Sequence, residues 1–143
     1  MTLTLQTLLT FAGVCHFGIL AASALVPRVL SWRTELRALS PLSRHLVWTH
    51  GVFIVLVIVA FGVISVAGAA DLAAGSRLAR LVCGFIAAFW LARLLVQLFL
   101  FDAGPFLTGP WLKLGYHGLT AVFTYLGLVY AWAAASPPNG VMP

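Results

Sequence analysis

The side chains of this chain that could bind a ligand lie inside long apolar stretches. His50 and His117 each precede a glycine, and each follows a proline, a basic residue and an aromatic residue. Two imidazoles at one depth on opposite sides of a helical bundle can be the axial ligands of a haem iron, and a glycine lets the macrocycle approach the backbone. The repeated pattern therefore predicts a b-type haem site in which His50 and His117 bind the iron, between two related helix pairs.

Arg93 is a cation inside an apolar stretch. Three acidic residues occur in the chain, and none lies in such a stretch: Glu35, Asp71 and Asp102. An arginine near a bilayer centre costs at least about 2.5–3.5 kcal/mol. Two interpretations follow. Arg93 snorkels to the surface beside Trp90 and Gln97, or it neutralises an anion brought by a ligand or a partner.

His16 lies in the middle of the first apolar stretch, where an imidazole needs a hydrogen-bond partner. It is either a packing residue whose hydrogen bonds are satisfied, or an alternative haem ligand or proton relay. Gly13 and Ser23 on the same helix face permit close contact with another helix.

The composition indicates that this chain is surrounded by lipid. Of its 143 residues 62% are apolar and 8% are charged, whereas roughly a quarter are charged in soluble proteins. A small soluble domain cannot bury so much apolar surface, which excludes a soluble enzyme, a nucleic-acid-binding protein and a disordered tail. Cys15 and Cys83 lack the spacing of a metal site, and no P-loop or hydrolase motif occurs.

Four stretches are long enough to cross a membrane, which takes about 20 apolar residues. We therefore expect an all-α, up-down four-helix bundle that forms one transmembrane domain over residues 1–143. Its helices are expected at about 4–26, 46–70, 79–101 and 112–135. Residues 27–45 are expected to form an amphipathic cytoplasmic loop whose polar part meets anionic headgroups.

Basic residues predict the orientation, because cytoplasmic loops carry an excess of lysine and arginine. The first and third loops together carry five, namely Arg28, Arg33, Arg37, Arg44 and Lys113, whereas the second loop carries Arg77 and Arg80. Both termini are then outside, in a membrane of the bacterial inner-membrane type.

In this topology several polar residues of the four helices share the cytoplasmic half of the bundle. They are expected to converge in one pocket, with two further residues beside it: His16, His50, Arg93, Gln97 and His117, with Trp90 and Arg44. Arg93 and Arg44 would bind haem propionates or quinone oxygens.

Three functions fit this pattern. The first is electron transfer by bound haem b or quinone, in a plan similar to the helical haem anchors of respiratory complexes; the paired histidines within single helices of dihaem cytochromes b are absent. The second is a non-catalytic accessory or assembly subunit of a larger membrane complex, or a homo-oligomer. The third is a lipid or isoprenoid-phosphate enzyme or transporter, although no span contains an acidic general base.

Overall fold

The computed structural model describes residues 2–29, 31–100 and 104–138. Its main helices are α1 (Thr2–Val29), α3 (Pro41–Ala67), α5 (Arg77–Leu95) and α6 (Pro110–Ala135). Short elements join them: α2 (Trp32–Glu35), the 3-10 turn η1 (Leu36–Ala38), α4 (Ala69–Ala74), the π-helical turn η2 (Val96–Leu100) and the 3-10 turn η3 (Gly104–Phe106). The described residues contain no strand.

Four helical segments are long and apolar enough to cross a membrane: Leu5–Val29, Pro41–Ala67, Arg77–Leu100 and Pro110–Ala135. Long apolar side chains cover their outer surfaces, as lipid contact requires. The predicted all-α four-helix membrane bundle is therefore confirmed.

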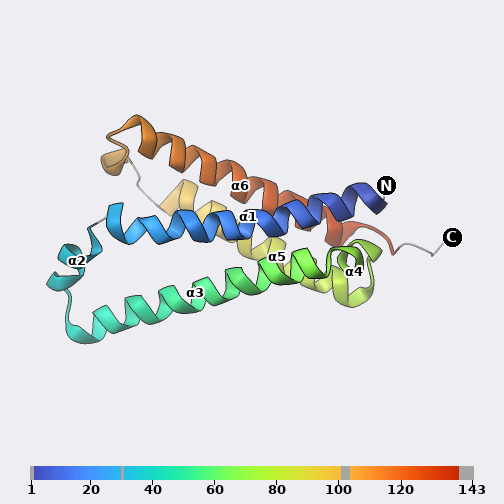
Figure 1. Cartoon of the computed structure of the whole chain (residues 1–143), viewed down its shortest axis with the longest axis horizontal. Helices are drawn as coiled ribbons and strands as arrows, with labels where there is room; N and C mark the ends of the chain where they lie inside the picture. Colours follow the sequence, from blue (N-terminus) through green and yellow to red (C-terminus); the bar gives the residue numbers. More distant parts are fainter. Residues whose placement is uncertain (1, 30, 101–103, 139–143) are drawn as a thin grey trace.

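The bundle consists of two helix hairpins. α1 packs against α3 and α4, α5 packs against α6, and contacts between α1 and α6 join the hairpins. Figure 1 shows α3 and α6 on opposite sides of α1, and these two helices spread apart towards the end where α2 lies, here called the loop end.

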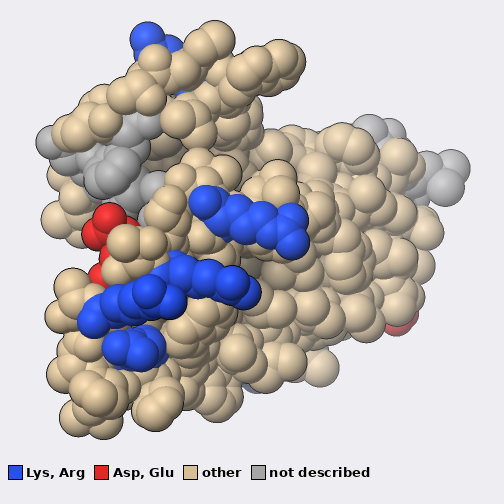
Figure 2. Space-filling model, turned by 60° about the vertical axis from the view of Figure 1, so that its left-hand side comes forward, with Lys and Arg blue, Asp and Glu red and all other residues tan. Residues whose placement is uncertain are grey.

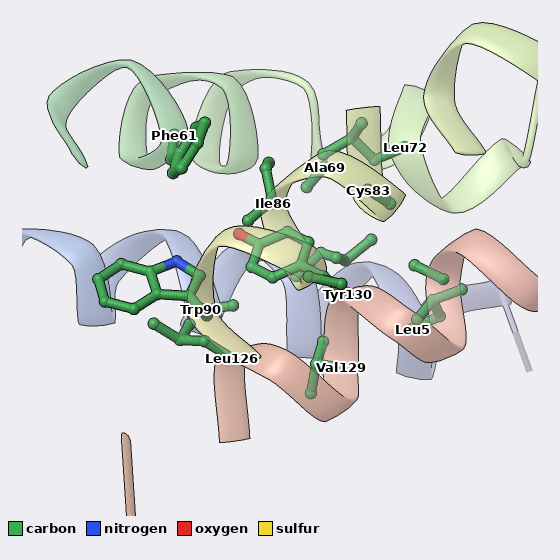
Figure 3. Close-up of a cluster of buried hydrophobic side chains, with 14 of the residues drawn as sticks. Leu5, Phe61, Ala69, Leu72, Cys83, Ile86, Trp90, Leu126, Val129 and Tyr130 are labelled. Carbon is green, nitrogen blue, oxygen red and sulfur yellow. The ribbon is translucent and has the colours of Figure 1, made fainter. Parts of the chain in front are cut away.

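The core occupies the half of the bundle away from the loop end, here called the packed half. Its buried side chains come from all four spans, among them Leu9, Phe61, Ile86 and Leu126 (Figure 3). The other half, here called the divergent half, comprises residues 20–29, 41–57, 91–100 and 110–122. Among these residues Gln97 is the buried one. The four helices therefore hold together along only part of their length.

Glycines mark the close helix contacts of the packed half. A Cβ on Gly13 of α1 would lie 2.7 Å from Cγ2 of Val66 on α3, and one on Gly127 of α6 would lie 2.6 Å from Cδ2 of Leu91 on α5. Small residues let helix backbones approach in lipid, where close packing rather than water exclusion drives association.

Several helix boundaries differ from those expected, most clearly at the start of α3. α3 begins at Pro41 rather than near residue 46, because the Ser40 side chain accepts a hydrogen bond from the backbone of Ser43 at 3.2 Å and proline suits the first helical position. The loop helix α2 has only four residues, and it starts after Ser31, whose φ of 50° is left-handed. The end expected at residue 101 lies outside the described residues.

Candidate functional site

The His16 imidazole is fully buried, and both of its ring nitrogens are hydrogen-bonded. Nε2 accepts the indole N–H of Trp90 on α5 at 3.0 Å, and Nδ1 lies 2.7 Å from the carbonyl oxygen of Ala12. An indole can only donate, so Nε2 must be unprotonated and Nδ1 must carry the hydrogen. This geometry matches a packing residue with satisfied hydrogen bonds, and a metal could bind Nε2 only by displacing Trp90.

Aromatic rings surround His16 in the packed half. Phe61, Trp90 and Tyr130 meet the imidazole edge-on, with centroids 5.4–6.0 Å apart. The Tyr130 hydroxyl is hydrogen-bonded to the Ser65 hydroxyl, and this bond joins α6 to α3. Figure 3 shows Trp90, Tyr130 and Phe61 among the buried apolar side chains. Neither the Trp90–His16 bond nor the Ser65–Tyr130 bond was predicted from the sequence, in which the signal is that hydroxyl and indole groups need partners in lipid.

Arg93 lies at the border between the packed and divergent halves. Its guanidinium carbon is 5.4 Å from the ring centroid of Phe123, and the Phe123 ring is stacked on Trp90 at 5.0 Å. The side chain is nevertheless exposed. Within residues 2–29, 31–100 and 104–138, no carboxylate forms an ion pair with Arg93.

Gln97 forms hydrogen bonds within the α5–α6 hairpin. Its amide nitrogen donates to the Thr120 hydroxyl, and its backbone carbonyl accepts the Tyr116 hydroxyl at 3.2 Å. Thr120 in turn donates to the carbonyl of Tyr116 on its own helix. Gln97 therefore holds η2 against α6.

His50 and His117 are exposed on different hairpins. His50 is hydrogen-bonded within its own helix, to the carbonyl of Leu46 at 2.8 Å, and His117 contacts the neighbouring Tyr116 ring. The N-terminal parts of α3 and α6, which carry these two histidines, lie on opposite sides of α1 (Figure 1). The described residues contain no group of three or more His, Cys, Asp or Glu side chains that could hold a metal ion, and haem ligation by His50 and His117 stays a prediction.

Arg44 lies at the loop end, away from Arg93. Its Nε donates to the Leu36 carbonyl at 3.2 Å, which ties the start of α3 to η1. Nearby, the rings of Trp32 and Trp48 meet edge-on at 5.8 Å.

Comparisons with protein-family models, curated proteins and solved structures found no match. The site is therefore interpreted from its own geometry.

The seven candidate residues do not converge in one pocket. His16 and Trp90 are in the core and Gln97 is in the α5–α6 contact. Arg44 is half-buried at the loop end, and the remaining three are exposed at separate places: His50, Arg93 and His117. Two hollows of about 200 Å³ are lined by residues around Arg80 and around Arg44, and of the seven candidates Arg44 alone lines either of these two. Similar depth along four helices did not bring these side chains together, because the helices diverge where most of these side chains lie.

Proposed function

We propose that the chain is a non-catalytic accessory subunit of a membrane complex. Its divergent half packs against transmembrane helices of a partner, and that partner supplies an anion to Arg93. The observation that carries this proposal is the exposed Arg93 cation, which has no ion pair among the described residues and lies where the two hairpins begin to separate.

The charge of Arg93 supports a partner because a guanidinium stays protonated in proteins and is expensive to leave in lipid. The Phe123 ring offers a cation–π contact, which offsets only about 0.5–2 kcal/mol. A carboxylate on a neighbouring helix would form charge-assisted hydrogen bonds with the same guanidinium.

The exposed glycines of the divergent half support a protein partner in particular. A Cβ on Gly51, Gly115 or Gly118 would meet no atom within 4 Å, whereas Gly13 and Gly127 in the packed half each touch another helix. Because small residues mark helix contacts inside this bundle, those of the divergent half suit contact with helices from outside it.

This role fits the contacts better than haem binding does. His16 has no free ring nitrogen, and the helices that carry His50 and His117 lie on opposite sides of α1. Ligation of haem by His50 and His117 stays a prediction that these contacts do not favour.

Photocrosslinking in native membranes tests the proposal. A photoreactive amino acid is placed at Gly118, which faces open space in the divergent half, or at Leu128, which is exposed beside the packed half. We expect position 118 to form an adduct with one discrete polypeptide. Arg93→Gln should remove this adduct, and position 128 should yield mainly lipid adducts.

Two results would contradict the proposal. One is lipid adducts alone at position 118, or a polypeptide adduct that Arg93→Gln leaves unchanged. The other is a Soret absorption band in the purified protein that disappears in His50→Ala and in His117→Ala, which would restore the haem prediction.

A further inference from the structure

A hollow of about 200 Å³ lies at the loop end, between α2, η1 and the first turns of α3. Six side chains line it: Trp32, Arg33, Leu36, Arg37, Arg44 and Trp48. The hollow is far along the chain from Arg93, and the inference drawn from it does not depend on the proposed partner subunit.

The lining of the hollow includes three arginines and no acidic residue. Arg33 and Arg37 are exposed, and the side chain of neither makes an ion pair or hydrogen bond to any described residue. Glu35, the nearest acid in the sequence, does not line the hollow. Figure 2, which turns the loop end forward, shows several Lys and Arg side chains gathered on this part of the surface, with an acidic side chain beside them, so that positive charge is in excess there.

Local hydrogen bonds fix the shape of the hollow. Arg44 donates from Nε to the Leu36 carbonyl at 3.2 Å and from a terminal nitrogen to the Leu39 carbonyl at 3.5 Å. The guanidinium of Arg44 is therefore held in place, with further N–H donors left over from the five that it carries.

The hollow also lies at the level of the membrane surface. The first membrane-spanning segment ends at Val29 and the second begins at Pro41, so the loop between them lies where lipid headgroups are. Trp32 and Trp48, in edge-on contact at 5.8 Å, present amphipathic rings of the kind that favour this level.

We propose that this hollow is a binding site for the headgroup phosphate of an anionic phospholipid. Guanidinium groups form paired hydrogen bonds with phosphate oxygens, and the two indole rings flank the upper acyl region. A zwitterionic headgroup adds an ammonium group, which the three arginines repel and which no carboxylate in the hollow receives.

Native mass spectrometry of the full chain in detergent tests this site. The protein is titrated with phosphatidylglycerol, or with phosphatidylcholine of the same acyl chains. We expect phosphatidylglycerol to bind about tenfold more tightly, since each basic residue near the lipid surface contributes about 1 kcal/mol. Arg33→Gln with Arg37→Gln should abolish this preference.

A matched control removes two charges outside the hollow, through Arg77→Gln with Lys113→Gln. This variant has the same net charge as the first one and should keep the preference for phosphatidylglycerol. Arg33→Lys with Arg37→Lys keeps the charge but loses the paired geometry, and it should keep part of the preference.

Three results would overturn the site. The first is equal binding of the two lipids. The second is an equal loss in both glutamine variants, which would show a response to net charge alone. The third is displacement of phosphatidylglycerol by millimolar inorganic phosphate, which would assign the hollow to free phosphate.

Discussion

Trp90 donates its indole N–H to Nε2 of His16 across 3.0 Å, and this bond joins α5 to α1 at the centre of the packed half. The partners are 74 residues apart in the chain. The bond fixes the tautomer of a fully buried imidazole and links the two hairpins.

Removing the indole donor should destabilise the bundle. Trp90→Phe leaves Nε2 of His16 without a partner, so the free energy of unfolding should fall by about 1–2 kcal/mol. Unfolding of the purified protein in mixed micelles with increasing SDS measures this change.

A double-mutant cycle separates the bond from the lost indole volume. His16→Phe with Trp90→Phe should cost less than the sum of the single changes, because neither partner is then left unpaired. Strict additivity would show that the bond contributes nothing.

The glycine contacts predict a contrast within α1. Gly13→Ala should lower stability by about 1–3 kcal/mol, because its Cβ would lie 3.0 Å from the Val66 backbone nitrogen as well as against its side chain. Gly18→Ala adds the same methyl group where no atom lies within 4 Å, so it should be neutral or slightly stabilising. Thermal unfolding in detergent compares the two, and equal effects would mean that Gly13 is not a close helix contact.

Arg93 should destabilise the isolated chain, although its charge is needed for contact with the proposed partner. Arg93→Leu removes an unpaired cation from a membrane span, so the free energy of unfolding should rise by about 1–2 kcal/mol in detergent, despite the lost contact with Phe123. The same variant should lose the crosslink from position 118. Arg77→Leu, at the start of α5, is the control and should not raise the free energy of unfolding comparably. A loss of stability in Arg93→Leu would contradict the prediction, because it would indicate that the Arg93 cation already has favourable contacts within the chain.

Orientation can be checked by labelling single introduced cysteines. Ala38→Cys lies at the loop end and Ala74→Cys lies on α4, and both positions are exposed. Since arginines concentrate at the loop end, a membrane-impermeant maleimide added to intact cells should label position 74 and not position 38. The reverse pattern would place both termini inside.

The candidate site was predictable residue by residue but not as an arrangement. Sequence alone indicated that His16 needs a hydrogen-bond partner, and the structure supplies it from Trp90. Sequence alone also indicated that Arg93 lacks an acid within its span, and among the described residues Arg93 has no ion pair. The matching His-Gly patterns suggested that His50 and His117 face each other. The structure places the helices that carry them on opposite sides of α1. Depth in the membrane follows from position along a helix, whereas the side chains that meet depend on how the helices pack.

Composition and hydropathy alone determined that this chain is an all-α membrane protein with four spans, because lipid requires each apolar segment to satisfy its own backbone hydrogen bonds. Only the tertiary structure decided which helices pair, where the core ends and which polar side chains meet. Those features arise from a few close contacts, such as Gly13 against Val66, between residues distant in the chain. No local pattern encodes such contacts, since each depends on the position and tilt of both helices.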